Sequence, residues 1–211
     1  MGRKTLLIPI EIVPPHVHLS AKAWNILFGK KFQPTILRPL SQRGQAIYRQ
    51  TIKIVGSGGE LEKVRILGGV RKQTQVELTE VVAMALGIKP VWRLSGRLSR
   101  SAGCKIVGPV GKMVIKNGVI VPISHLHLNS KDAQNFGFSQ GQEIELSFVE
   151  DKETKIKAVV RIHPSFRAVL HITSEEAAKH WFSPTEKVKL CNFFYFFFLF
   201  FFYYHFLPKP A

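Results

Sequence analysis

Short runs of alternating apolar and polar residues follow one another along most of the chain. Six runs are rich in β-branched residues and predict strands at 51–56, 63–67, 104–108, 112–124, 143–149 and 155–162. Gly, Pro and Asn separate these runs, and Asn117-Gly118 has the sequence typical of a tight hairpin turn. Helical patterns are few and short: they follow Ser20, Asn129 and Thr173, and one lies near 79–87. Many short strands with few helices predict a mainly β protein built from small β-barrels.

Three histidines recur in one sequence context. His18 begins "HLSAKA", His127 begins "HLNSKDA" and His171 begins "HITSEEA". Each follows a predicted strand and precedes a Ser, Asn or Thr that is able to cap a short helix. We therefore expect these histidines at a recurring strand-to-helix corner, and the repetition predicts two related small β-barrel domains with short helices.

The repeat divides the chain near residues 90–105. We expect a first barrel domain at 1–95, with the His-Val-His motif and the "RKQTQVE" strand, which could also receive a C-terminal strand. A second barrel domain is expected at 96–190, with the His-Leu-His motif and His171. Residues 191–211 form an aromatic low-complexity tail that we expect to lie outside the fold. We interpret it as the result of translation through T-rich DNA after a frameshift or a missed stop codon. An interfacial anchor or a partner-binding segment is the alternative for this tail.

The chain is strongly basic, with 30 Lys and Arg against 14 Asp and Glu and a formal net charge of +16. This balance favours an anionic partner, which could be nucleic acid, a membrane surface or a phosphorylated small molecule. Cys104 and Cys191 lie far apart without a CxxC pair, so neither a disulfide framework nor a thiolate zinc site is expected. The N-terminal sequence has no secretory signal, which favours the cytoplasm.

Two His-x-His motifs are the first candidates for chemistry. Side chains at positions i and i+2 of a strand share one face, so both imidazoles of each motif can reach one metal ion at about 2.0–2.1 Å. The alternative is that these histidines pack or cap locally, but the repetition favours metal binding, with zinc as the ion that best suits imidazole ligands. The donors are His16, His18, His125, His127 and His171. We expect His163, His180 and His205 at the surface or in the tail.

Two further stretches carry polar residues that could serve a site. Alternation in "GGVRKQTQVELT" places Gln73, Gln75 and Glu77 on one strand face, where a carboxylate can be a metal ligand, a general base or a solvent-facing partner of Arg71. The stretch "RLSGRLSRSAG" at 93–103 is suited to holding phosphate, or to linking domains.

Together these stretches resemble the phosphate propanoyltransferase family, the PduL-type phosphotransacylases, over about residues 7–190. The matching segments are "HVHLS", "LSQRGQ", "VRILGGVRKQTQVELT", "ALGIKPVWRLSG", "SAGCKIVGPVGK", "GVIVPISHLHLNSKDAQNFG" and "LHITSEEA". The resemblance implies two β-barrel domains with the active site between them, two zinc ions and a homodimer. It also implies transfer of a short acyl group, acetyl or propanoyl, between coenzyme A and inorganic phosphate.

Residue roles follow from the same resemblance. It implies that His16 and His18 hold one zinc ion. The residues implied for the other ion are Glu77, His125, His127 and His171. Arg71 matches a phosphate-contacting arginine, and Ser95 matches a serine beside the reacting groups. Phosphate would then attack the thioester directly, without an acyl-enzyme.

Three departures from the family pattern accompany the match. Pro15 and Ser124 stand where a basic residue usually precedes each His-x-His, and Arg97 stands where an acid is more usual. The extension that directs some relatives into bacterial microcompartments does not precede the core, which favours a free cytoplasmic enzyme over a microcompartment enzyme.

Two other functions compete with the acyltransferase. A zinc-dependent hydrolase would use the same ligands to activate water. A nucleic-acid-binding β-barrel would use the net charge, but it would place aromatic residues among basic ones. Because the aromatic residues instead concentrate in the tail, we expect no nucleic-acid partner. The aromatic run at 193–207 is shorter than the roughly 20 residues that a helix needs to span a bilayer, so we expect no membrane span.

Overall fold

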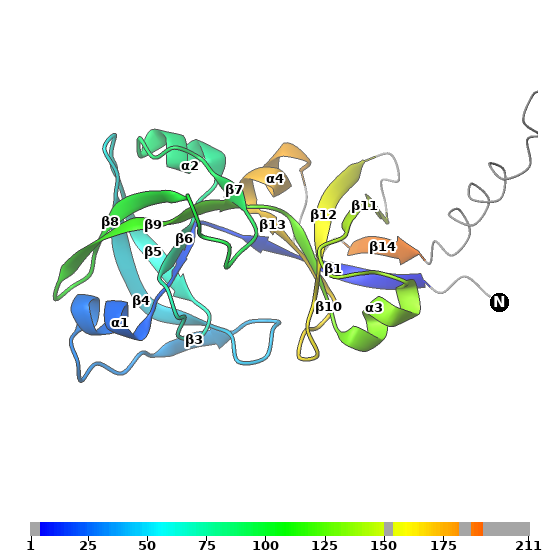
Figure 1. Ribbon diagram of the computed structural model, residues 1–211, viewed down its shortest axis with the longest axis horizontal. Helices are drawn as coiled ribbons and strands as arrows, with labels where there is room; N and C mark the ends of the chain where they lie inside the picture. Colours follow the sequence, from blue (N-terminus) through cyan, green and yellow to red (C-terminus); the bar gives the residue numbers. More distant parts are fainter. Residues whose placement is uncertain (1–4, 150–153, 182–186, 192–211) are drawn as a thin grey trace, which may run out of the picture.

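The computed structural model describes residues 5–149, 154–181 and 187–191. These residues form two six-stranded β-barrels side by side with a few short helices, so the mainly β fold class is confirmed (Figure 1). The aromatic run at 193–207 and His205 lie outside the described residues. No helix within the described ranges is long and apolar enough to cross a membrane.

The first barrel is closed by pairing of its last strand with its first. In order around the barrel its strands are β4 (Ala46–Val55), β5 (Glu60–Leu67), β2 (His16–His18), β6 (Gln75–Glu77), β9 (Lys112–Pro122) and β8 (Ala102–Val107). Two further strands extend this sheet: β3 (Ile36–Pro39) pairs with β4, and β7 (Trp92–Arg93) pairs with β9.

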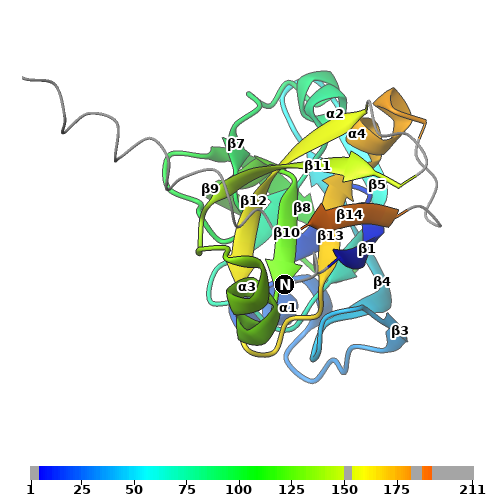
Figure 2. The ribbon, with the colours of Figure 1, turned by 90° about the vertical axis from the view of Figure 1, so that its right-hand side faces the viewer.

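The second barrel faces the viewer in Figure 2. In order around the barrel its strands are β1 (Thr5–Val13), β13 (Val169–Thr173), β10 (His125–Leu128), β12 (Lys155–Ile162), β11 (Glu143–Phe148) and β14 (Lys187–Cys191). β1 and β14 are antiparallel neighbours, which closes the ring.

The two barrels repeat one pairing pattern, as the sequence repeat predicts. In the first barrel, β2 lies between a parallel neighbour, β5, and an antiparallel neighbour, β6. In the second, β10 lies in the same way between β12 and β13. A helix follows each of the strands β2, β6, β10 and β13. These helices are α1 (Ala21–Phe28), α2 (Glu80–Ala85), α3 (Ser130–Phe136) and α4 (Ser174–Lys179).

One strand of each repeat lies in the barrel of the other. β1 precedes the first His-x-His strand but belongs to the second barrel, and β9 precedes the second His-x-His strand but belongs to the first (Figure 1). The sheets therefore do not divide the chain at residue 95: the first barrel takes β8 and β9 from beyond that position. The C-terminal strand β14 lies in the second barrel, not in the first. β1 lies in the second barrel because its residues Ile8 and Ile10 are buried in the core of that barrel.

The expected hairpin at Asn117-Gly118 is wrong, because β9 runs through both residues as one strand. Against β8, Cys104 pairs with Ile115 while Ala102 pairs with Val119, so β9 bulges between these pairs. Gly118 has a φ of +125°, and a Cβ there would lie 2.7 Å from the carbonyl oxygen of Thr74. Glycine is therefore required by the bulge and the close approach, not by a turn.

Each barrel has its own apolar core, and alternation along the His-x-His strands separates core from site. Val17 in β2 and Leu126 in β10 are completely buried in the first and second cores. The histidines on either side of them point to the opposite face. Burial of one such apolar side chain stabilises the fold by roughly 1.5–3 kcal/mol, which anchors each histidine pair on a rigid strand.

Candidate active site

A cavity of about 330 Å³ lies between the barrels, and both contribute to its lining. The strand pairs β2–β6 and β10–β13 bring two clusters of ligand-type side chains to it. The first cluster is His16, His18 and Glu77, and the second is His125, His127 and His171. The six residues expected to bind metal therefore gather at one cavity, in two groups of three.

The first cluster comes from directly paired strand positions, since His16 stands opposite Glu77. Nε2 of His16 lies 3.1 Å from Nε2 of His18 and 3.4 Å from Oε2 of Glu77. Nε2 of His18 lies 3.5 Å from Oε1 of the same carboxylate. All three side chains are almost completely buried.

Backbone carbonyls fix the tautomers of these two histidines. Nδ1 of His16 lies 2.9 Å from the carbonyl oxygen of Pro14, and Nδ1 of His18 lies 2.8 Å from that of Leu67. Because a carbonyl only accepts, each Nδ1 carries the proton and donates it, and each Nε2 is left with a lone pair facing the cavity.

The first cluster fits a cation. Two imidazole lone pairs and a carboxylate converge with no proton between the nitrogens, an arrangement that a positive ion stabilises. Ligands of a tetrahedral zinc ion at about 2.0–2.1 Å lie about 3.3 Å from one another. The separations of 3.1, 3.4 and 3.5 Å within the cluster agree with this spacing.

The charge states in the first cluster also suit a metal. Burial lowers the pKa of His16 to about 4, so its imidazole is neutral at neutral pH. Burial alone would raise the pKa of Glu77, but the neighbouring His16 and His18 hold it well below its usual range. A neutral imidazole and an ionised carboxylate are the forms that bind metal without first releasing protons.

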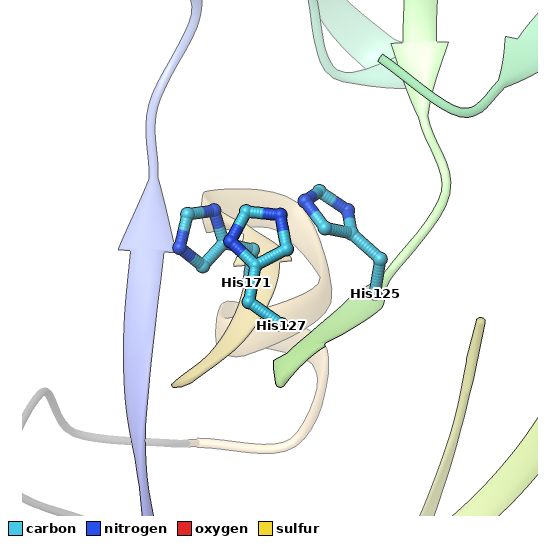
Figure 3. A group of neighbouring side chains, drawn as sticks. All are labelled: His125, His127 and His171. Carbon is cyan, nitrogen blue, oxygen red and sulfur yellow. The ribbon is translucent and has the colours of Figure 1, made fainter. Parts of the chain in front are cut away.

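The second cluster joins three imidazoles from β10 and β13 (Figure 3). His125 stands opposite His171 across the two strands, and its Nδ1 donates to the carbonyl oxygen of Ile123 over 2.9 Å. The ring centroids lie 5.1 Å apart for His125 and His171, and 4.6 Å apart for His127 and His171. Burial lowers the pKa of His125 to about 4 and that of His127 further.

His127 shows most directly that this cluster fits a metal. Both of its ring nitrogens are buried, and neither has a hydrogen-bond partner among the residues that the structure describes. Burying a polar atom without a partner costs roughly 1–3 kcal/mol, and a metal ion would remove this cost for one nitrogen. The ring of Phe166 stacks on His127 at 4.1 Å and shields it from water.

Four strand-to-helix corners carry residues of the two clusters, one more than the sequence repeat predicts. His18, His127 and His171 stand at such corners as expected, and Glu77 occupies the fourth, two residues before the cap Thr79. The segments "ELTE" at 77–80 and "HITS" at 171–174 each place a cluster residue two positions before a capping Thr. An alignment on histidines alone missed this correspondence. The expected grouping of Glu77 with the second cluster therefore differs from the structure, where Glu77 faces His16 and corresponds to His171 of the other repeat.

The cavity also brings the two expected catalytic residues to the metal-ligand clusters. Arg71 lines it, and its buried Nε has no hydrogen-bond partner among the described residues. Ser95 accepts a hydrogen bond of 2.9 Å from Nε2 of Gln75, which also donates to Glu77. Gly96 N donates to Oε1 of Gln75 over 2.8 Å, which holds this network in place.

Sequence reasoning missed the positions of Arg161 and His163 at the cavity. Arg161 pairs with His127 across β10 and β12 and lines the cavity, although it reads as one more basic residue of an alternating strand. His163 is exposed, as expected, and it also lines the cavity, with Nδ1 2.7 Å from Oγ of Ser165. Both positions depend on the pairing of β12 with β10, which the local pattern does not specify.

Each of the two β-barrels presents a buried cluster of metal-ligand type to a shared cavity lined by arginines. These features define a class of protein suited to metal-assisted chemistry on an anionic substrate. The family model for phosphate propanoyltransferase matches residues 9–182. A phosphate propanoyltransferase of Thermotoga maritima is 34% identical over 194 residues, covering 90% of this chain and 92% of the relative. One from Priestia megaterium is 35% identical over 171 residues, covering 81% and 79%. The chain belongs to the phosphate propanoyltransferase family, and it is an acyltransferase of the phosphotransacylase type.

Proposed function

We propose that the protein is a zinc-dependent phosphate acyltransferase that moves an acetyl or propanoyl group between coenzyme A and inorganic phosphate. The observation that carries this proposal is the meeting of both ligand clusters with Arg71 and Arg161 in one cavity. One zinc ion would be held by His16, His18 and Glu77. The other would be held by His125, His127 and His171. When bound, the ions supply Lewis-acid stabilisation of negative charge on phosphate and on the thioester oxygen.

The arginines give the cavity its second property, affinity for phosphate. Guanidinium groups bind phosphate oxygens through pairs of parallel hydrogen bonds. Nε of Arg71 is buried without a hydrogen-bond partner in the described part of the chain, and Arg161 stands beside His127 on the neighbouring strand. Phosphate held by these groups would lie next to both clusters, where one of its oxygens can attack the acyl carbon.

Apolar residues in the lining suit the acyl chain and the thiol arm of coenzyme A. Leu40, Ile47 and Ile123 belong to this part of the cavity. Ser95 is fixed beside Glu77 by Gln75, so its hydroxyl is a rigid polar contact for the reacting groups. The small cavity supports a short acyl chain.

Direct attack by phosphate requires no covalent intermediate. Cys104 is buried in the first core, and burial raises the pKa of its thiol to about 12, so it is not a nucleophile for this reaction. Intact mass measured after incubation with acetyl-CoA alone should therefore equal that of the untreated protein. A stable mass increase of one acetyl group would show an acyl-enzyme and refute direct attack.

The test of the proposed function is thiol release from acetyl-CoA and propanoyl-CoA, measured with and without inorganic phosphate. We expect release only with phosphate, formation of the acyl phosphate, loss of activity on chelation and recovery on adding zinc. Release that does not depend on phosphate would identify a hydrolase instead. Arg71→Ala should raise the KM for phosphate, whereas Arg65→Ala, at an exposed position of β5, should leave it unchanged.

We also propose that the enzyme is a cytoplasmic homodimer. Exposed apolar side chains support a subunit interface, among them Ile36 and Leu37 on β3, a strand at the end of the sheet path. The free buried thiol of Cys104 is consistent with a reducing compartment. Sedimentation velocity tests the dimer, and a monomer at micromolar concentration would refute it.

A further inference from the structure

A carboxylate outside the two clusters contacts one of the ligand histidines. Oε2 of Glu11 lies 3.0 Å from Nε2 of His171. The two residues stand opposite each other in the parallel pair β1–β13, so their side chains share one face of the sheet. Both line the cavity between the barrels.

A loop of the first barrel holds this carboxylate in place. Ser41 donates a hydrogen bond of 2.6 Å from Oγ to the same Oε2 of Glu11. The next residue, Gln42, donates from Nε2 to the carbonyl oxygen of Arg167 and accepts from the backbone N–H of Arg167, each over 3.1 Å. Gln42 is only 6% exposed, so the loop is anchored firmly across the boundary between the barrels.

Glu11 thereby gives His171 an orienting partner of its own. His16, His18 and His125 are each oriented by a backbone carbonyl that accepts from Nδ1. The Nε2 side of His171 instead faces a carboxylate, which leaves Nδ1 as the nitrogen for a metal. At 3.0 Å the two atoms are within hydrogen-bonding distance, although Nε2 has no aligned hydrogen-bond partner among the described residues. Carboxylates in this position fix the ring and increase the basicity of a ligand histidine.

We propose that Glu11 is a positioning residue for the second cluster: held by Ser41, it orients His171 for metal binding through Nδ1. This inference rests on the proposed function, because it assumes that the second cluster holds a metal ion. It assigns the "LSQRGQ" loop a role in metal binding by the opposite barrel.

The test compares zinc affinity at the two clusters in Glu11→Ala, Glu11→Gln and Ser41→Ala. Zinc per chain is measured by elemental analysis during titration with a graded chelator, and cobalt-substituted protein is followed by its visible absorption. Glu11→Ala should weaken one zinc site 10- to 100-fold and leave the other unchanged. Glu11→Gln keeps an acceptor oxygen and should recover part of the affinity, and Ser41→Ala should lose a few-fold.

Glu145→Ala is the matched control, because Glu145 lies in the same barrel and forms an exposed ion pair of 3.1 Å with Lys155. It should bind both ions as the unmodified chain does. Wild-type affinity at both sites in Glu11→Ala would overturn the inference, as would equal weakening of both. If Glu11→Ala fails to fold, Ser41→Ala decides, and wild-type binding there would overturn the inference.

These measurements use no acyl substrate, so they are independent of the proposed reaction. A chain that binds two zinc ions but does not transfer acyl groups would refute the proposed function alone. A chain that transfers acyl groups with unaltered metal binding in Glu11→Ala would refute the role of Glu11 alone. Fewer than two bound ions in the unmodified chain would overturn the role of Glu11, and acyl transfer would then be judged by the assay above.

Discussion

The turn after β5 offers a sharp test of how the first barrel holds His18. Gly68 has a φ of +82°, and a Cβ at this position would lie 2.8 Å from Nδ1 of His18 and 2.5 Å from Oε1 of Gln45. The preceding carbonyl, of Leu67, accepts the hydrogen bond that fixes the His18 tautomer. Gly68→Ala should therefore strain the backbone and displace the imidazole together.

The magnitude follows from these two effects. A residue with a Cβ in the left-handed region costs roughly 1–2 kcal/mol. Displacement of His18 removes a buried hydrogen bond, and leaving its partner unsatisfied costs roughly 1–3 kcal/mol more. A total of about 2–5 kcal/mol should lower Tm by roughly 4–20 °C for a chain of this size.

Gly141→Ala is the matched control, because Gly141 has the same φ of +82° and nothing lies within 4 Å of a Cβ there. It should carry only the backbone cost, a Tm decrease of roughly 2–8 °C, with unchanged zinc content. Gly68→Ala should in addition lose zinc from the first cluster, measured by elemental analysis beside calorimetry. Equal Tm and equal zinc content in the two variants would refute the coupling between this turn and His18.

Three further substitutions test the local arguments. Asn129→Ala removes a cap whose Oδ1 accepts from Asp132 N at 2.8 Å, and should lower Tm by about 2–4 °C, measured by calorimetry. Leu126→Ala opens a cavity in the second core and should lower the free energy of unfolding in urea by about 2–5 kcal/mol, whereas a loss below 1 kcal/mol would contradict its full burial. In a Cys191→Ser background, Cys104 should not react with Ellman's reagent at pH 8 until the protein unfolds, since burial keeps its pKa far above that pH; prompt reaction would disprove this protection.

Local signals were enough to predict the elements that hold the residues of the two clusters. Period-two alternation placed both imidazoles of each His-x-His on one face, and the capping residues Ser20, Asn129 and Thr173 marked the helix starts. These features depend on neighbouring residues alone, so a single sequence contains them. The Asn117-Gly118 hairpin was wrong because the same two residues also suit a bulge, and only pairing with β8 decides between them.

Features that depend on strand partners could not be predicted in the same way. Alternation shows that β1 and β9 have an apolar face, but it does not show which barrel core that face enters. Glu77 joined the first cluster because β6 pairs with β2, a contact set by barrel closure. Arg161 and His163 reach the cavity for a similar non-local reason, the parallel pairing of β12 with β10.

The exchange of β1 and β9 between the barrels has a consequence for synthesis on the ribosome. All strands of the first barrel have been made once translation passes Pro122, the end of β9. β1 is made before any of them, yet its partners are β13 and β14, and Thr5 pairs with Cys191. Its apolar residues Ile8 and Ile10 must therefore stay without their core until almost the whole chain has emerged. During that interval the nascent chain presents an unpaired strand, which makes it a substrate for chaperones that bind exposed apolar segments.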